Sequence, residues 1–553
     1  MSLCSLWNLA NIPISPRAST ARSSPYEQRP AQRNIQSIGK GLLRMARLIM
    51  LASGLTALLA VVLYFDELSS TRASAYSLLG QWSSLLQQIP GPSSELDLDN
   101  STSMAWDIRY HLGGNSPWIP KARGIVPDGI NLPIGCRVEQ VHMVGYLRVW
   151  VHLTHPKGML ELYHHIRGAN VTLNGTLAFA NSWDFFMKNP SERLENLVAT
   201  GPYAGTLEAF NTGVKLGTRY EHLLDYAIEH NETAFWASGS KRVVETAQYF
   251  AAGMYGLEWQ NTSRLHIIPE TEDRGGDTLT AGKTCFRYLH NADEFGRQYG
   301  YRMWNEWREV YLPPITKRLQ EQNPAMSFTT SEIYSMQELC GFETIAKGSS
   351  KWCDLFTHNE WLQFEYARDI LHYYRTGSGN PYSSSIGWLW LNATATLLQQ
   401  GPAAGTLFFS FVHDGDVIPM LTALDLLPHE KQHLPATHAP QNRVWQTSDL
   451  VPMGGRIIFE RLVRGEPKQC WDHAEYGYPN HVYCSQSTEE HFVRINVNDG
   501  VVALPGCDSG PGRSCPLDQF LERISKKGEE VGDFREVCGL PRSAKAGIEF
   551  LHQ

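Results

Sequence analysis

Two short segments of the chain carry side chains that can bind and protonate an oxyanion. In the first, His413 and Asp414 follow the apolar run 406–412, where a strand is expected to end and a helix to begin. A histidine at such a junction can neutralise an oxyanion, and an aspartic acid can donate a proton to a leaving oxygen. Asp414 or Asp416 can instead cap the helix, and the dipeptide alone does not decide between these roles.

The second segment begins at Ser238 and places Arg242 in the first turn of a predicted helix. A guanidinium beside the unpaired N–H groups of a helix N-terminus is a natural phosphate site. The alternative for Arg242 is a surface position or a salt bridge. Both segments therefore suggest oxyanion chemistry without establishing it.

Three apolar runs predict the elements that position these side chains: residues 137–144, 233–237 and 406–412. Two of them lead into helical patterns, whose apolar positions are Val243, Ala247, Phe250 and Met254 in one case and Ile418, Leu421, Leu424 and Leu427 in the other. A strand followed repeatedly by a helix predicts an α/β fold with a parallel-sheet core covered by helices. Ligands bind beyond the carboxyl ends of such strands.

A helix-rich stretch covers roughly residues 290–400 and predicts an all-α lobe inserted into the α/β domain. Capping boxes begin two of its helices, at Thr329 with Glu332 and at Thr357 with Glu360. The second helix is expected to end before Gly377.

The N-terminal part of the chain divides into three segments before the globular body, residues 106–553. Residues 1–47 are rich in Ser, Arg and Pro and are expected to be disordered, and residues 66–105 form a polar linker. Between them, residues 48–65 are apolar and uncharged, long enough for a signal anchor. A signal peptide explains the same pattern if translation starts at Met45, with a cleavage site at residues 73–75.

Composition restricts the class of protein and its compartment. Hydrophobic residues make up 42% of the chain and charged residues 19%, which is typical of a globular protein. The net charge of −8, without a basic block in the body, argues against nucleic acid as a partner. Ten cysteines and six glycosylation sequons favour a secreted, extracellular or cell-wall protein, or one anchored through residues 48–65 with its body on the non-cytoplasmic side; the sequons are at Asn100, Asn170, Asn174, Asn231, Asn261 and Asn392.

Several collinear motifs extend these observations from Trp106 to about Gly539. They include Tyr110-His-Leu-Gly-Gly-Asn115, Cys136-Arg-Val-Glu-Gln-Val, Thr200-Gly-Pro-Tyr-Ala-Gly-Thr206, Cys353-Asp-Leu-Phe-Thr357, Phe409-Ser-Phe-Val-His-Asp414, Met453-Gly-Gly-Arg456 and Gly510-Pro-Gly-Arg-Ser-Cys515. With the Arg242 helix, they make the chain resemble the fungal histidine acid phosphatases, including their phytase-like members.

The resemblance implies a histidine phosphatase fold and hydrolysis of phosphomonoesters through a phosphohistidine. Arg242 and His413 would bind phosphate, and Asp414 would protonate the leaving alcohol. A small phosphomonoester or inorganic phosphate is the implied partner, and no metal or other cofactor is implied.

The family's nucleophile motif, Arg-His-Gly-x-Arg-x-Pro, is absent from the place where the resemblance predicts it. After Val144 the chain instead reads Gly145-Tyr-Leu-Arg-Val-Trp-Val-His-Leu-Thr-His-Pro156, and residues 146–153 favour a continued strand. Arg148, His152 and His155 do not have the motif's spacing or order, so no nucleophile is identified. The foreign block lies between two well-matched flanks, which is typical of a retained intron, a misdrawn exon or a local frameshift.

Two functions therefore compete. The first is an acid phosphatase that resembles the phytase-like members of the family. The second is a catalytically inactive secreted glycoprotein, or the product of a mis-spliced gene.

The resemblance also implies the pairing of the cysteines, which spacing alone does not determine. It predicts the disulfides Cys340–Cys353, Cys507–Cys515 and Cys285–Cys538, with Cys136 joined to Cys470 or Cys484. Cys4 is expected to be free. A zinc site is not expected, because the chain has no Cys-x-x-Cys pair and no His-rich ligand set.

Overall fold

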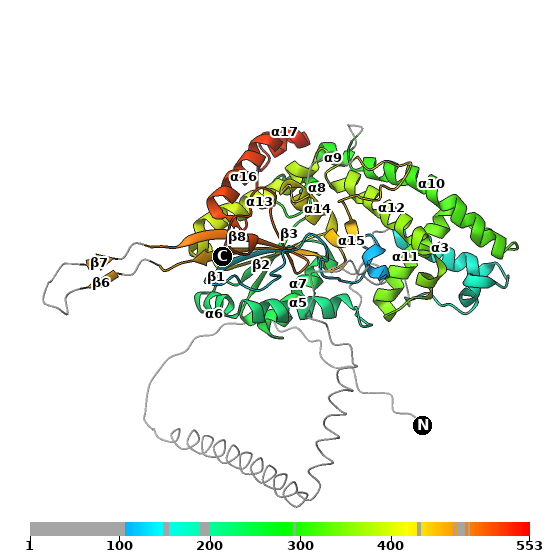
Figure 1. The fold of residues 1–553 in the computed structure, drawn as a ribbon, viewed down its shortest axis with the longest axis horizontal. Helices are drawn as coiled ribbons and strands as arrows, with labels where there is room; N and C mark the ends of the chain where they lie inside the picture. The colour runs from blue at the N-terminus through cyan, green and yellow to red at the C-terminus, as the bar shows by residue number, and fades with distance from the viewer. Residues whose placement is uncertain are drawn as a thin grey trace, which may run out of the picture. The chain divides into compact units, whose positions relative to one another are not determined.

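The structure, a computed structural model, describes residues 106–146, 154–187, 199–290, 295–427, 433–467, 470–472, 482–484 and 487–553. The described residues belong to one compact unit, Ala105–Gln553 (Figure 1). The predicted segments 1–47, 48–65 and 66–105 lie outside the described residues. Within the described ranges, no helix is long and apolar enough to cross a membrane.

Four parallel strands form one half of the central sheet and confirm the parallel core. In spatial order they are β1 (Cys136–Gly145), β4 (Leu407–Phe411), β2 (Ala234–Ser238) and β3 (Arg264–Ile268). β4 is buried along its whole length, as its unbroken apolar run predicts. Because the four strands are parallel, their carboxyl ends meet at one edge of the sheet.

The other half of the sheet is antiparallel, which the sequence analysis did not predict. It consists of β5 (Arg456–Arg464), β8 (Glu490–Val497), β9 (Gly500–Val502) and β10 (Cys515–Pro516). β5 pairs antiparallel with β1 and with β8. Between β5 and β8 in the chain, β6 (Cys470–Asp472) and β7 (Val482–Cys484) form a separate two-stranded sheet. An antiparallel strand needs no crossover helix before it, so the strand–helix pattern in the sequence does not predict it.

Helices cover both faces of the sheet (Figure 1). One face carries α5 (Gly205–Arg219), α6 (Glu221–His230) and α7 (Lys241–Tyr255), and the other carries α13 (Ser383–Gln400), α14 (Asp414–Ala423) and α16 (Leu517–Val531). Glycines let α5 and α7 approach closely, because a Cβ at Gly213 would lie 2.1 Å from the Phe250 carbonyl oxygen. α5 therefore packs directly against the middle of α7.

The predicted helical lobe consists of α10 (Gln298–Gln322), α11 (Thr330–Lys347) and α12 (His358–Thr376), beside α3 (Thr154–Gly168). Both predicted capping boxes are present, at Thr329 and Thr357, and α12 ends before Gly377 as expected. The last helix of the stretch, α13, packs on the sheet side, where the Trp390 ring lies 5.7 Å from that of Phe459.

Short elements complete the described fold. The α-helical ones are α8 (Ala281–Thr284), α9 (Phe286–His290), α15 (Thr447–Leu450) and α17 (Phe534–Cys538). The 3-10 turns are η2 (Ile108–His111), η3 (Gly175–Asn181), η4 (Trp259–Asn261), η5 (Glu272–Arg274), η6 (Lys351–Leu355), η7 (Gly401–Ala404) and η9 (Pro511–Arg513).

Three of the expected disulfides are present in the structure: Cys285–Cys538, Cys340–Cys353 and Cys507–Cys515. The expected fourth pairing is wrong for Cys136, which is a free, partly buried cysteine. Cys136 begins β1 opposite Arg464 of β5, whereas Cys470 and Cys484 lie opposite each other in the ladder of β6 and β7. The backbone register thus places Cys470 and Cys484 beside each other rather than beside β1. Cys4 lies outside the described residues.

Candidate active site

The carboxyl ends of the parallel strands bring the predicted site residues together. β2 leads through a short loop into α7, and β4 leads directly into α14, which begins at Asp414. The end of β1 lies at the same edge, since the Val412 N–H donates to the Gly145 carbonyl oxygen at 3.0 Å. Arg242, His413 and Asp414 therefore come from two junctions of one sheet edge, as predicted.

Arg242 is the second residue of α7 and reaches from that helix to His413. Its Nη2 atom lies 3.4 Å from Nδ1 of the imidazole. The positive end of the α7 dipole lies beside the guanidinium, so both favour an anion at this position.

His413 is the N-cap residue of α14, and its side chain is only 9% exposed. Its backbone N–H donates to Oδ2 of Asp416 at 3.1 Å, which closes the first turn of the helix. Its Nε2 atom lies 2.7 Å from Oε1 of Glu270. The imidazole is thus held by a carboxylate on one side and by the Arg242 guanidinium on the other.

Glu270 was not identified from the sequence, although it contacts His413 directly. It follows β3 and also forms an ion pair with Lys283 of α8. Burial would raise the pKa of Glu270, but the hydrogen bonds and charges of His413 and Lys283 outweigh it and hold this pKa well below its usual range. The signal for Glu270 was available, because it follows a strand end just as His413 does.

Asp416 shows the opposite electrostatic behaviour. Burial raises its pKa to about 8, because the hydrogen bond from His413 compensates only part of the lost solvation and the charges of Glu270 and Asp414 add to the shift. The first turn of α14 therefore contains a carboxyl group that favours its neutral form.

Asp414 is half-buried and lies within the electrostatic reach of two arginines of α12. Burial would lower the pKa of Arg368 and of Arg375, but nearby negative and phenolic groups, Asp414 among them, raise both values. The Nη2 atom of Arg375 lies 3.7 Å from the position that a Cβ on Gly415 would occupy. The lobe thus supplies positive charge beside the proposed proton donor, another feature that the sequence analysis missed.

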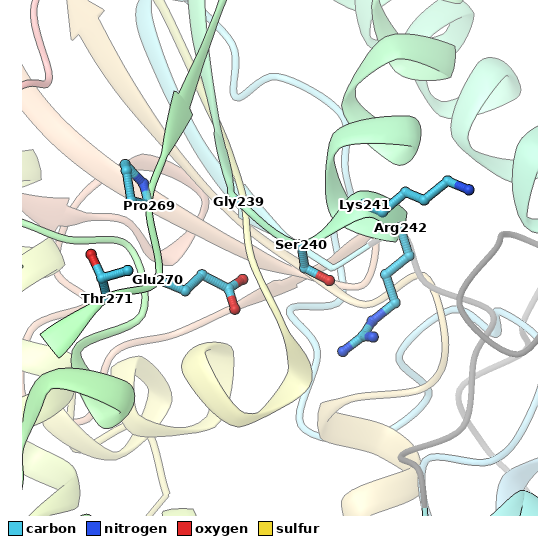
Figure 2. Close-up of a pocket in the computed structure, with 7 residues that line it drawn as sticks. All are labelled: Gly239, Ser240, Lys241, Arg242, Pro269, Glu270 and Thr271. Carbon is cyan, nitrogen blue, oxygen red and sulfur yellow. The ribbon is translucent and has the colours of Figure 1, made fainter.

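A pocket of about 480 Å³ opens between the junctions that follow β2 and β3. Figure 2 shows the Glu270 carboxylate and the Arg242 guanidinium extending from opposite walls, with Ser240 between them. The lining residues are Gly239, Ser240, Lys241, Arg242, Pro269, Glu270 and Thr271. The pocket combines a guanidinium with a helix N-terminus, and the His413 imidazole contacts the lining residues Arg242 and Glu270. This combination suits a tetrahedral anion.

The described residues contain no group of three or more His, Cys, Asp or Glu side chains that could hold a metal ion.

The segment after β1 differs from the predicted continued strand, because β1 ends at Gly145. The following Tyr146 lies outside the strand and donates its hydroxyl to the Val451 carbonyl oxygen at 2.6 Å. Arg148 and His152 lie outside the described residues. His155 belongs to the first turn of α3, and its side chain lies outside the description.

Comparison with known proteins identifies relatives of this arrangement. Residues 104–498 match the family described as the Histidine phosphatase superfamily (branch 2). Phytase PHO112 of Candida albicans is 30% identical over 452 residues, which cover 80% of this chain and 90% of that protein. Acid phosphatase PHO1 of Komagataella pastoris is 30% identical over 458 residues, covering 81% and 90%.

Solved structures agree with this assignment. The crystal structure of the phytase from D. castellii has a TM-score of 0.71 and 26% identity, and the match covers 84% of this chain and 94% of that one. A multiple inositol polyphosphate phosphatase of Bifidobacterium longum shares the fold, with a TM-score of 0.53 and 12% identity over 75% of this chain and 97% of that one.

Proposed function

This chain belongs to branch 2 of the histidine phosphatase superfamily, a family of phosphoric monoester hydrolases, and we propose that Arg242 and His413 are its phosphate-binding side chains. The observation that carries the proposal is their 3.4 Å approach across two separate strand–helix junctions, at the edge of a pocket. Asp414, the first residue of α14, is the proposed proton donor to the leaving alcohol.

The proposed chemistry separates binding from bond cleavage. Arg242 and the protonated imidazole would neutralise the phosphate oxygens, and Asp414 would supply the proton that an alkoxide leaving group needs. Cleavage also needs a nucleophile in line with the leaving oxygen. Phosphate binding and proton donation do not replace that nucleophile. The Arg-His-Gly-x-Arg-x-Pro motif is absent from this sequence.

That absence favours the second candidate function, a phosphate-binding glycoprotein without turnover. As written, the polypeptide from residue 76 onward is expected to hydrolyse p-nitrophenyl phosphate no faster than buffer. Turnover that His152→Ala or His155→Ala abolishes would contradict this expectation. Sequencing the cDNA across codons 140–160 decides whether the natural protein carries the motif and is an active phosphatase.

A repaired protein tests the role of Asp414. Replacing residues 145–157 with a family-type Arg-His-Gly-x-Arg-x-Pro loop is expected to restore hydrolysis. In that protein, Asp414→Asn should slow alkyl phosphates by ~10²–10⁴-fold, because general-acid help matters most for poor leaving groups. The loss on p-nitrophenyl phosphate should be much smaller. Equal losses on both substrates would make Asp414 a structural residue.

Phosphate binding tests the pocket without requiring turnover. Two arginines of the family motif are absent, and each charge-assisted contact contributes ~1.5–3 kcal/mol, so affinity should be weaker by about two to four decades. We expect calorimetry to detect phosphate binding in the millimolar range or weaker. Micromolar binding that Arg242→Ala leaves unchanged would place the anion site elsewhere.

We propose that the protein enters the secretory pathway and carries glycans on residues 106–553. All five sequon asparagines that the structure describes are exposed: Asn170, Asn174, Asn231, Asn261 and Asn392. The three disulfides also suit an oxidising compartment. A mass shift on treatment with an endoglycosidase tests this proposal, and an unshifted mass after expression in a fungal host would contradict it.

A further inference from the structure

The imidazole of His413 lies between a group that can only accept a hydrogen bond and a group that can only donate one. The Glu270 carboxylate accepts at 2.7 Å from Nε2, so Nε2 carries a hydrogen. The Arg242 guanidinium donates, and its Nη2 atom faces Nδ1 at 3.4 Å. Without a ligand, these partners therefore select the neutral tautomer with its proton on Nε2.

Anion binding changes what Nδ1 must do. A tetrahedral oxyanion offers only acceptors, so an anion oxygen beside Arg242 and His413 needs a donor on both sides. Nδ1 provides that donor only after it has gained a proton. The anion then accepts from Nδ1–H and from the guanidinium. Without the anion, these two groups would be two donors facing each other.

The charges around His413 favour this protonation once an anion is bound. Glu270 contacts Nε2 directly, whereas Asp416, which accepts from the His413 backbone N–H, favours its neutral form and is not counted as a negative charge. Asp414 follows in the chain, while Arg242 and, through Glu270, Lys283 supply the opposing positive charge. An anion compensates Arg242, so the Glu270 carboxylate remains as the direct partner of the imidazolium.

We propose that anion binding at this site takes up one proton at Nδ1 of His413, and that Glu270 is the positioning residue that makes this uptake possible. The proton comes from solvent, Nε2 keeps its own proton for Glu270, and no covalent bond between heavy atoms forms or breaks. The inference rests on the proposed function, since that places the anion between Arg242 and His413.

Calorimetry with sulfate tests the coupling in the protein as it exists. Sulfate is a tetrahedral dianion that does not titrate between pH 5 and 8, so any proton taken up belongs to the protein. Titrations in buffers of different ionisation enthalpy measure this number. The wild type is expected to take up close to one proton per sulfate at pH 7 and fewer as the pH falls.

Glu270→Gln separates the positioning role from simple charge removal. The variant keeps an acceptor for Nε2–H but loses the negative charge that stabilises the imidazolium, so proton uptake at pH 7 should fall. The ratio of sulfate affinities at pH 5 and pH 7 should grow by ~10-fold, the effect of one lost opposite-charge partner. Any constant effect of removing a carboxylate cancels from this ratio.

Glu272→Gln is the matched control, because Glu272 is an exposed carboxylate two residues further along and is not a partner of His413. It should leave both the ratio and the proton uptake unchanged. His413→Gln should abolish the uptake. Thermal unfolding of each variant checks that the fold is intact, and the wild-type measurement does not depend on any variant.

The outcomes distinguish this inference from the proposed function. Sulfate binding that Arg242→Ala weakens, but that takes up no proton in the wild type, overturns the inference alone. An affinity ratio in Glu270→Gln equal to that of the wild type removes the role of Glu270. Sulfate binding that is absent, or indifferent to Arg242→Ala, overturns both.

Discussion

Two clusters of charge in this protein differ in how deeply they are buried and in how short their contacts are. In the antiparallel half of the sheet, Glu460 accepts from Arg494 Nε at 2.6 Å, from Arg219 Nη2 at 2.9 Å and from the Tyr220 hydroxyl at 2.7 Å. Its carboxylate is fully buried, and both oxygens are occupied. At the parallel edge, the Arg242–His413 contact measures 3.4 Å, and the guanidinium lines an open pocket.

The two clusters also shift the pKa values of their acids in opposite directions. Burial would raise the pKa of Glu460, yet the charges and hydrogen bonds of Arg494 and Arg219 lower it. Asp416, beside the site, has its pKa raised to about 8 because its partners do not compensate for burial. The Glu460 cluster is closed within the fold, where removing one partner of a buried ion pair is costly, whereas the Arg242–His413 cluster is open to a pocket that a ligand can enter.

The largest effect is expected from opening the closed cluster. Glu460→Gln removes the charge that Arg494 and Arg219 share and leaves both guanidiniums without a compensating carboxylate. The free energy of unfolding should fall by ~3–5 kcal/mol, the usual cost of breaking a buried pair. Urea denaturation measures this loss, with the exposed Glu221→Gln as control. A loss below ~1 kcal/mol would remove the contrast between the clusters.

The corresponding change at the open cluster should affect binding instead of folding. Arg242→Ala is expected to change the free energy of unfolding by less than ~1 kcal/mol, because Arg242 is only partly buried. Phosphate affinity should nevertheless fall by ~1.5–3 kcal/mol, or about one to two decades. Calorimetry and urea denaturation on the same preparation test both halves of this statement. A large stability loss without a binding loss would make Arg242 structural.

The last effect concerns pH. The folded-state pKa of Asp416, about 8, lies above its ordinary value of 3.8, so between these values the folded protein binds more protons than the unfolded chain. This carboxyl therefore contributes fully to stability below pH 4, and the contribution is lost as pH rises toward 8, by up to ~1.4 kcal/mol per pH unit.

Asp416→Asn removes this titration while keeping an acceptor for the His413 N–H. Its stability relative to the wild type should increase between pH 5 and pH 7, as followed by thermal unfolding. Asp518→Asn, at an exposed acid in the first turn of α16, is the control and should show no such trend. A parallel pH dependence in the wild type and Asp416→Asn would show that Asp416 titrates normally.

The sequence by itself determined the features that local chemistry encodes. The capping boxes at Thr329 and Thr357 predicted two helix starts, because a cap forms within four consecutive residues. The strand–helix junctions placed Arg242 and His413 at one edge, since parallel strands share the direction of their ends. The resemblance to a family added three disulfides, which the structure contains, and the proposed roles of these side chains. Local patterns contain neither.

Only the tertiary structure decided which distant groups meet. Glu270 contacts His413 and Lys283 contacts Glu270, each from another segment of the chain. Glu270 follows a strand end, but no local pattern pairs it with His413 or with Lys283. The antiparallel pairing of β5 with β1 was equally invisible, and it leaves Cys136 opposite Arg464 as a free thiol instead of in a disulfide. Local propensity depends on residues that are close in the chain. Hydrogen bonds, ion pairs and disulfides depend instead on which groups the packed sheet places within a few ångströms of one another.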